Sequence, residues 1–385
     1  AIAQRKQRSE IITLDPKRQE RARRYASLQR WLFLAELGLG VLFLVALIWS
    51  NVSLRLRDAL SLPHYAAAAL FFTVISAVYS VLSFPLSYYQ GLALPRRYGL
   101  SRETFREWLV TLAKEAMLGW ILGAGTTVAI YTLLFSLPDW WWLGAALLTA
   151  LLSAFLSFIA PWFIMPLFFK SEPLPQGELR QRLESLAAKA GFSIAGIFTI
   201  DWSKKGDTAN AMFLGMGRSR RIVLTDTLLK NYTPEEMETI LAHELGHYRL
   251  RHVSQLLILQ SCLAFVVFAL THLVLKQFAN PVGPFGLSGP SDLAGLPILA
   301  LGLLFFSLAL SPLIMAFSRH IENQADDFSV KLTGNPTAFA QALLRLHEQN
   351  LAEADPSRWV EVLFYDHPSL ARRLAHMRQP RRDNS

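Results

Sequence analysis

The sequence predicts a mainly α-helical protein that crosses a membrane several times. Hydrophobic residues make up 52% of its 385 residues and charged residues only 17%, against about 25% in ordinary soluble domains. Several stretches reach the roughly 20 apolar residues that a helix needs to cross a bilayer. Six spans are predicted, over residues 29–50, 65–91, 116–137, 140–169, 253–277 and 295–318.

Basic residues between these spans predict the orientation of the chain. The 38 Lys and Arg against 29 Asp and Glu give a formal net charge of +9. Six spans place four basic segments on one side of the membrane, namely 1–28, 92–115, 170–252 and 319–385. The loops on the other side carry few basic residues or none. By the positive-inside rule the basic side is cytoplasmic, so the net charge requires no nucleic acid as a partner.

The segment 170–252 is predicted to fold into a domain rather than to link two spans. Its pattern predicts a helix over 176–191, a strand over 196–202 and a β-hairpin over 209–229. The helix is expected to stop at Gly191. A small β-sheet is therefore expected next to the membrane spans.

One long helix is expected to begin at Thr233. Thr233 suits the N-cap position, Pro234 suits the first helical position, and Glu236 completes a capping box. No helix breaker follows until about residue 280. The helix is therefore expected to run from residue 234 through the fifth span without interruption.

This helix carries the motif His243-Glu244-Leu245-Gly246-His247. Two histidines four residues apart project from one face of a helix toward one metal ion, and Glu244 lies beside them. The arrangement is typical of zinc peptidases, in which the glutamate takes a proton from a metal-bound water. The alternative interpretation is a polar helix face with two solvated histidines.

A catalytic zinc site usually has a third protein ligand, and Glu322 is the best candidate. It begins the motif Glu-Asn-Gln-Ala-Asp just after the sixth span, on the same predicted side of the membrane as His243. Asp326 follows one helical turn later, where it can accept a hydrogen bond from a ligand imidazole. Asp327 offers the same chemistry, but its spacing is less favourable. A solvated helix end is the alternative for Glu322 and Asp326.

These motifs resemble the type I CaaX prenyl endopeptidase family of integral-membrane zinc metallopeptidases. HELGH is followed by one span, a second span and then ENQADDFSVKL, in the family's order. Four further segments look like parts of the same family, and they cover residues 83–105, 161–187, 207–229 and 350–374. The likeness extends over roughly residues 20 to 377 and is more specific than HExxH alone.

The resemblance implies roles for individual residues. One Zn²⁺ per chain would be bound by His243, His247 and Glu322, with Glu244 as general base and Asp326 as the partner of a ligand. His367 matches a histidine that helps to stabilise the oxyanion. The residues implied in substrate binding are Asn210, Ala211 and Met212 on an edge strand, and Arg373. The remaining histidines are expected to be structural, and they are His64, His252, His272, His320, His347 and His376.

The resemblance also implies a fold. Family members have a ring of seven membrane helices around a chamber, capped by a gluzincin-like zinc-protease domain. Only six spans are found here, and the seventh is expected ahead of residue 1. Met212 departs from the family, whose members often carry an aromatic residue there. The predicted organisation is a basic segment (1–28), four spans (29–169), the first catalytic part (170–252), two spans (253–318) and the second catalytic part (319–385).

The predicted function is a zinc metalloendopeptidase that cuts prenylated or other membrane-associated proteins within an intramembrane chamber. One alternative is quality control of damaged membrane proteins without prenyl specificity, as performed by the heat-shock membrane protease HtpX. A membrane scaffold or transporter is the non-enzymatic alternative, which the intact motifs disfavour. A bacterial inner membrane is favoured as the location, or the endoplasmic reticulum if the protein is eukaryotic. Beyond the lipid bilayer and the peptide substrate, no partner or oligomer is required.

Overall fold

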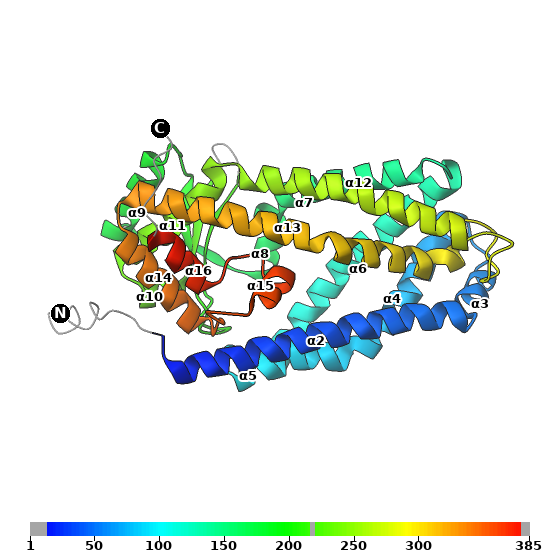
Figure 1. Ribbon diagram of the computed structural model, residues 1–385, viewed down its shortest axis with the longest axis horizontal. Helices are drawn as coiled ribbons and strands as arrows, with labels where there is room; N and C mark the ends of the chain where they lie inside the picture. The colour runs from blue at the N-terminus through cyan, green and yellow to red at the C-terminus, as the bar shows by residue number, and fades with distance from the viewer. Residues whose placement is uncertain (1–13, 216–219, 379–385) are drawn as a thin grey trace.

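The protein is an elongated helical bundle with a small sheet at one end (Figure 1). This computed structural model describes residues 14–215 and 220–378. Part of the predicted basic N-terminal segment (1–13), the hairpin turn (216–219) and the last residues (379–385) lie outside the described residues.

Six long helices run along the bundle (Figure 1), and their contacts close them into a ring. They are α2 (Pro16–Trp49), α4 (His64–Tyr88), α6 (Phe105–Ser136), α7 (Trp141–Ile159), α12 (His252–Phe278) and α13 (Leu296–Thr333). Each packs against the next in this order, and α13 packs against α2. The six predicted spans are confirmed by length and apolar composition among the described residues. The family resemblance implied a ring of seven helices, and the six long helices among the described residues are in contact all the way round.

Short elements extend or connect the long helices. A π-helical turn (Tyr89–Ala93) leads from α4 into α5 (Leu94–Arg97), and another (Ala160–Ile164) leads from α7 into α8 (Met165–Phe168). At the end far from the sheet, α3 (Val52–Asp58) packs against the turn Leu293–Gly295.

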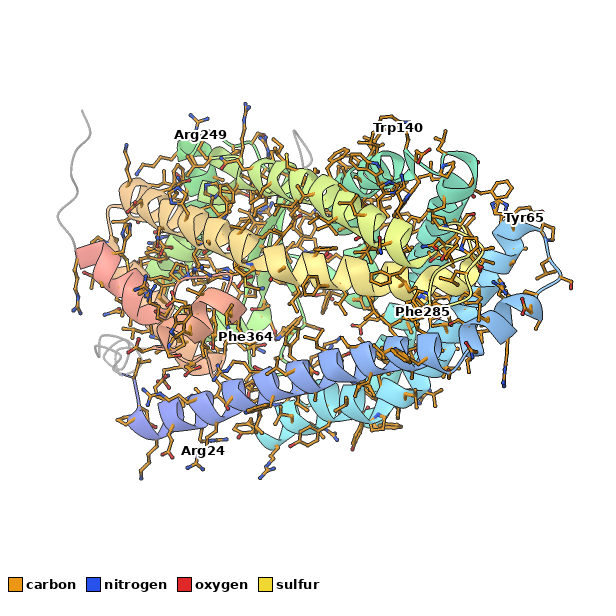
Figure 2. The ribbon with its side chains drawn as sticks, turned by 45° about the vertical axis from the view of Figure 1, so that its right-hand side comes forward. Arg24, Tyr65, Trp140, Arg249, Phe285 and Phe364 are labelled. Atoms are coloured by element: carbon orange, nitrogen blue, oxygen red, sulfur yellow. The ribbon has the colours of Figure 1, made fainter. Side chains whose placement is uncertain are left out.

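The two ends of the bundle differ in their exposed side chains. Arg24 and Arg249 lie at the end that carries the sheet, whereas Tyr65 and Trp140 lie at the opposite end (Figure 2). Trp140 is 62% exposed and Tyr65 is 60% exposed. Aromatic side chains of this kind gather where a membrane meets water, because one end of the side chain is apolar and the other is polar.

Four strands form the sheet in the order β1-β2-β4-β3. They are β1 (Ser171–Pro173), β2 (Gly196–Ile200), β3 (Ala211–Leu214) and β4 (Arg221–Thr225). The β2–β4 pair is parallel, and the β1–β2 and β3–β4 pairs are antiparallel. The β3–β4 pair confirms the predicted hairpin. Among the described strands β3 pairs only with β4, so the other edge of β3 is open.

Six helices complete the part of the chain around the sheet. They are α9 (Glu178–Lys189), α10 (Asp226–Asn231), α11 (Pro234–Arg249), α14 (Pro336–Gln349), α15 (Arg358–Phe364) and α16 (Leu370–Arg378). Apolar side chains from α9, β2, β3, β4 and α11 form one buried core. The predicted helix over 176–191 is confirmed as α9.

The prediction of one uninterrupted helix from residue 234 through the fifth span is wrong. α11 ends at Arg249, and α12 begins at His252. Between them Arg251 has φ 58° and ψ 35°, a left-handed conformation that cannot continue a right-handed helix. The side-chain amide of Gln255 donates a hydrogen bond of 2.8 Å to the carbonyl of Leu250, which replaces a helical bond lost at this turn.

The sixth span, in contrast, belongs to a longer helix than predicted. α13 does not stop near residue 318 but continues to Thr333. Gly334, with φ 66°, ends it in the left-handed conformation that glycine adopts without steric cost. One helix therefore runs from the apolar span to the candidate site.

Candidate active site

The candidate site lies where α11 crosses α13. The capping box predicted at the start of α11 is present, because Thr233 and Glu236 each bond the backbone N–H of the other. Ser329 on α13 donates a hydrogen bond of 2.7 Å to the carbonyl of Thr239 on α11. At Gly246 the helices are so close that an added Cβ would lie 3.2 Å from Ala325 and Phe328 atoms. The glycine of HELGH thus permits the close crossing.

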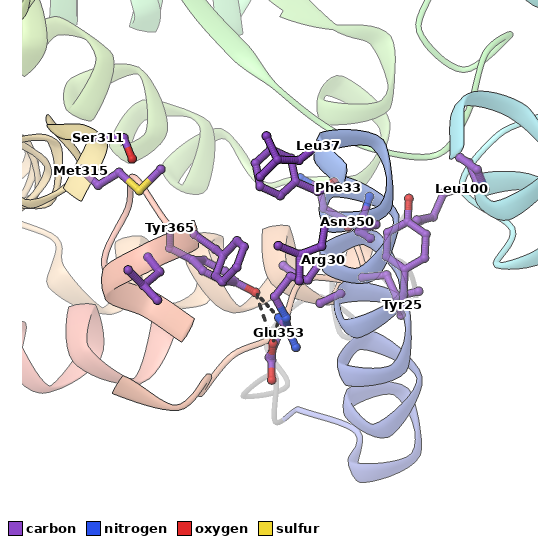
Figure 3. Close-up of a pocket in the computed structure, with 18 of the residues that line it drawn as sticks. Tyr25, Arg30, Phe33, Leu37, Leu100, Ser311, Met315, Asn350, Glu353 and Tyr365 are labelled. Carbon is purple, nitrogen blue, oxygen red and sulfur yellow. Dashed lines mark hydrogen bonds and ion pairs between the residues drawn. The ribbon is translucent and has the colours of Figure 1, made fainter. Parts of the chain in front are cut away.

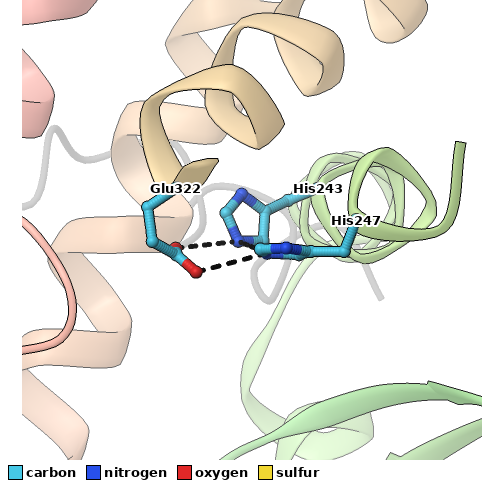
Figure 4. Close-up of side chains that lie close together, drawn as sticks. All are labelled: His243, His247 and Glu322. Carbon is cyan, nitrogen blue, oxygen red and sulfur yellow. Dashed lines mark hydrogen bonds and ion pairs between the residues drawn. The ribbon is translucent and has the colours of Figure 1, made fainter. Parts of the chain in front are cut away.

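This crossing brings His243, His247 and Glu322 together (Figure 4). The Nε2 atoms of the two histidines are 3.2 Å apart. The Glu322 carboxylate reaches each of them at 3.3 Å, with Oε2 facing His243 and Oε1 facing His247. His243 and Glu322 are buried, and His247 is half-buried. The structure therefore places the three predicted ligand residues in one cluster.

The spacing of these atoms fits a bound metal ion. Ligand atoms held about 2.0–2.1 Å from a tetrahedral ion lie about 3.3 Å from one another. The two Nε2 atoms are 3.2 Å apart, and each lies 3.3 Å from a different oxygen of the Glu322 carboxylate. Two imidazoles and one carboxylate are also a donor set found in catalytic zinc sites. The cluster can hold one tetrahedral ion and leave its fourth position for water or substrate.

A buried carboxylate orients the first ligand. Asp326 Oδ1 lies 2.9 Å from Nδ1 of His243, on the side of the ring away from the cluster. Arg373 from α16 holds Asp326 in turn through two bonds, of 2.8 Å from Nε and 2.6 Å from Nη2. Asp327 instead lies 3.2 Å from His376, so of the two aspartates it is Asp326 that the structure places against His243. Although burial disfavours the imidazolium, Asp326 and Glu322 raise the pKa of His243 to about 9.

The structure places Arg373 next to Asp326, on the side of Asp326 away from the three candidate ligands. Its side chain is buried, and its guanidinium carbon lies 5.9 Å from the centre of the Phe339 ring. The family resemblance implied a substrate-binding role for this arginine. The observed pairing adds a second interpretation, in which Arg373 fixes the orientation of His243 through Asp326.

His252 was expected to be only structural, yet it contacts a residue of the cluster. His252 is the first residue of α12, and its Nδ1 lies 3.0 Å from Nδ1 of His247. Its Nε2 lies 3.0 Å from the side-chain oxygen of Gln324 on α13. The turn at Arg251 makes this possible, because an unbroken helix would carry residue 252 away from residue 247. The run of three histidines at 243, 247 and 252 was the available signal.

Glu244 and His367 are polar side chains next to the cluster that can exchange protons. Glu244 is half-buried beside its two neighbouring histidines, and burial raises the pKa of its carboxyl. His367 lies in the turn before α16, and its Nε2 is 3.3 Å from Glu322 Oε1. A contact of 2.7 Å with Asp366 raises the pKa of His367. His367 was placed near the site only through the family resemblance, since it lies 45 residues beyond Glu322 in the chain.

The predicted edge-strand residues lie on and before β3, which packs against α11. Asn210 is exposed, and its side-chain oxygen accepts a 2.9 Å bond from the Ala211 N–H. Met212 is half-buried and paired in register with Val223. The open edge of β3 can add one extended peptide strand through backbone bonds.

Two family models match the sequence. Residues 173–381 match peptidase family M48, and residues 8–170 match the N-terminal region of CAAX prenyl proteases, described as five membrane helices. Together the matches cover the ring of helices, the sheet and both helices of the cluster.

Individual relatives are similar over most of their length. CAAX prenyl protease 1 of Saccharomyces cerevisiae is 31% identical, over 80% of this chain and 71% of the relative. An uncharacterized metalloprotease of Bacillus subtilis, YhfN, is also 31% identical, over 92% of this chain and 84% of the relative. The crystal structure of Ste24p from S. mikatae superposes with a TM-score of 0.83 at 26% identity, covering 95% of this chain and 90% of that one.

Proposed function

Because this chain belongs to peptidase family M48 and is a multi-pass membrane metallopeptidase, we propose that it uses one Zn²⁺ ion to hydrolyse prenylated CaaX-type peptides. His243, His247 and Glu322 hold the ion in this proposal. The observation that carries it is the clustering of their ligand atoms, with the two Nε2 atoms 3.2 Å apart and each 3.3 Å from an oxygen of the Glu322 carboxylate. The prenylated substrate is taken from the names of relatives such as the S. cerevisiae protease.

Each residue near the cluster has a separate task in the proposed reaction. When bound, zinc lowers the pKa of water and polarises a carbonyl group. Glu244 accepts a proton from the attacking water and passes it to the nitrogen of the leaving amine. His367 donates a hydrogen bond to the oxygen that becomes negative in the tetrahedral transition state. Asp326 holds the ring of His243 in one orientation.

The substrate backbone is proposed to lie along the open edge of β3. Strand addition holds a peptide through main-chain bonds, so it accepts many sequences but requires an extended chain. Asn210, Ala211 and Met212 supply this edge. The edge strand and the ligand helix α11 are in contact, which supports delivery of the extended chain to the cluster.

The orientation proposed for the protein places the cluster on the cytoplasmic side of the membrane. The basic segments flank the end that carries the sheet, in agreement with the positive-inside rule. A single chain provides the closed ring and all three ligands, which supports activity as a monomer. Labelling of an engineered surface cysteine in intact cells tests the orientation, with Cys262→Ser as the background. Labelling by an impermeant reagent from outside the cell would contradict it.

The proposed activity is tested with two peptides that end in a CaaX box, one farnesylated and one not. The wild type is expected to cleave the farnesylated peptide faster. Glu244→Gln should keep its zinc and lose turnover by about 10²–10⁴-fold, the usual range for a general base. Glu238→Gln is the matched control, because Glu238 lies on the same helix but pairs with Arg182 away from the cluster.

Three results would count against parts of the proposal. Substantial turnover by zinc-replete Glu244→Gln would remove Glu244 as the base. Equal cleavage of both peptides would retain the hydrolytic mechanism but favour general proteolysis of membrane proteins. If the zinc-loaded wild type cleaved neither peptide, the proposed substrate class would be contradicted.

A further inference from the structure

A large apolar pocket opens between α2, α13 and α15 (Figure 3). Its volume is about 890 Å³, within the usual range for small-molecule sites. The side chains that define its apolar walls are Phe33, Leu34, Leu308, Met315, Leu363 and Phe364. None of these six residues has a role in the reaction proposed above.

An ion-pair network holds the walls of this pocket together. Arg30 on α2 contacts Glu353 at 2.8 Å, and the hydroxyl of Tyr365 donates to the same carboxylate at 3.2 Å (Figure 3). These contacts join the first membrane helix to the C-terminal part of the chain. The spacing between α2 and α15 is therefore fixed before any ligand binds, which lowers the entropic cost of binding.

The pocket lies between the part of α13 that precedes the cluster and the segment that leads to His367. Tyr365 lies two residues before His367, which contacts Glu322. On α13, Met315 and Leu308 precede Glu322 by seven and fourteen residues. At about 1.5 Å per residue, the pocket spans distances of about 10 to 21 Å from Glu322 along the helix.

These distances match the length of a prenyl chain. An extended farnesyl group is about 15 Å long, because its main chain of twelve carbons advances by roughly 1.3 Å per bond. A cysteine side chain adds a few Å. A farnesylated cysteine held at the cluster therefore reaches Leu308 at the far end of the pocket.

A second apolar cavity in the ring provides a contrast. It has a volume of about 660 Å³ and lies between α2, α4, α6 and α13. Its nearest residue on α13 is Leu304, eighteen residues before Glu322, or about 27 Å along the helix. A farnesyl chain attached at the cluster is too short to occupy this cavity.

We propose that the pocket between α2, α13 and α15 binds the hydrocarbon chain of a prenylated substrate while its peptide lies at the cluster. This inference rests on the proposed function and adds the location of the lipid. In this proposal the pocket responds to chain length, because Leu308, its lining residue on α13 that is farthest from Glu322, lies at about the distance that a farnesyl group reaches. Leu308 and its neighbours act on specificity and take no part in the chemistry.

Leu308→Trp and Leu304→Trp form a matched pair for the test. Both replace leucine by the same larger side chain on the same helix, but only Leu308 lines the proposed pocket. Leu308→Trp should lower kcat/KM for a farnesylated peptide about tenfold, as expected from excluding about two methylene groups. It should leave a geranylated and an unprenylated peptide within about twofold of wild type. Leu304→Trp should leave all three peptides unchanged.

The proposal would be overturned if Leu308→Trp kept the wild-type ratio of kcat/KM between the farnesylated and the geranylated peptide. It would also be overturned if Leu304→Trp lowered kcat/KM for the farnesylated peptide more than Leu308→Trp does. A wild type that does not prefer the farnesylated peptide would also overturn it. Size-exclusion profiles and thermal unfolding of both variants in detergent show whether they are folded.

Crosslinking provides a readout that does not depend on turnover. A peptide whose farnesyl group ends in a photoreactive diazirine is bound to zinc-loaded Glu244→Gln and irradiated. Labelling of the α2 and α13 segments around Phe33 and Leu308 would support the proposal, and labelling confined to the second cavity or the outer surface would overturn it. Should the wild type cleave no peptide, the proposed function fails while this experiment still decides where the chain binds.

Discussion

Replacing Arg373 by methionine tests how the first metal ligand is held. Arg373 is the charged partner of Asp326, at 2.6 and 2.8 Å, and Asp326 contacts His243 at 2.9 Å. The side chain of Asp326 is fully buried. Methionine has a similar length but no charge, so it leaves a buried carboxylate beside the ligand without its main counter-charge.

The expected losses follow from this burial. Removing one partner of a buried ion pair costs about 3–5 kcal/mol of folding free energy, because the other charge is left uncompensated. Asp326 can limit that cost by taking up a proton, but it then accepts a weaker hydrogen bond from His243. Loss of such an outer partner typically lowers metal affinity 10–100-fold. That range corresponds to about 1.4–2.7 kcal/mol of binding free energy.

The assay combines zinc affinity, by competition with a chelator, with the unfolding temperature of the zinc-free protein in detergent. Arg373→Met should lower both. Arg24→Met is the control, because Arg24 forms an exposed ion pair with Glu20 and should change neither. Unchanged zinc affinity together with a raised KM would refute the reasoning and support the substrate-binding role implied by the resemblance.

Three further substitutions test the remaining geometry of the cluster. Glu322→Ala should lower zinc content markedly, measured by elemental analysis of the purified protein, and unchanged zinc would remove Glu322 as a ligand. Gly246→Val should force α11 away from Phe328 on α13, where even one added Cβ lies at 3.2 Å, and should reduce both zinc content and thermal stability. A fully loaded, stable Gly246→Val protein would show that the crossing tolerates a wider spacing. His252→Phe should lower zinc affinity about 10–100-fold through its contact with His247, while Gln255→Glu, at the same turn, should not. Equal effects of these two variants would attribute the loss to the turn rather than to the imidazole.

Local sequence rules predicted those parts of the molecule that local interactions determine. The capping box at Thr233 and Glu236 depends on residues three apart, and both hydrogen bonds are present. The spacing of His243 and His247 places both rings on one helix face, and their Nε2 atoms are 3.2 Å apart. The six apolar spans follow from composition and length.

Other features depend on contacts between distant segments, which no local pattern records. The helix breaks at Arg251 although neither glycine nor proline is present there, and His252 then contacts residues of two different helices. The pairing of Asp326 with Arg373 joins positions 47 residues apart. Closure of the ring likewise depends on distant segments, because α2, the first long helix described, packs against α13, the last one.

The length of α13 has a consequence for how substrates are found. Its 23 uncharged residues from Leu296 to Ser318 extend about 34 Å, close to the roughly 30 Å thickness of a bilayer's hydrocarbon layer. Glu322 follows one turn after this stretch, so a bilayer whose hydrocarbon layer covers the stretch would have its headgroups at the level of the cluster. A protein already anchored in the same membrane presents its anchored end at that height and searches in two dimensions by lateral diffusion. A soluble protein must reach the same level from the bulk and expose an extended segment there.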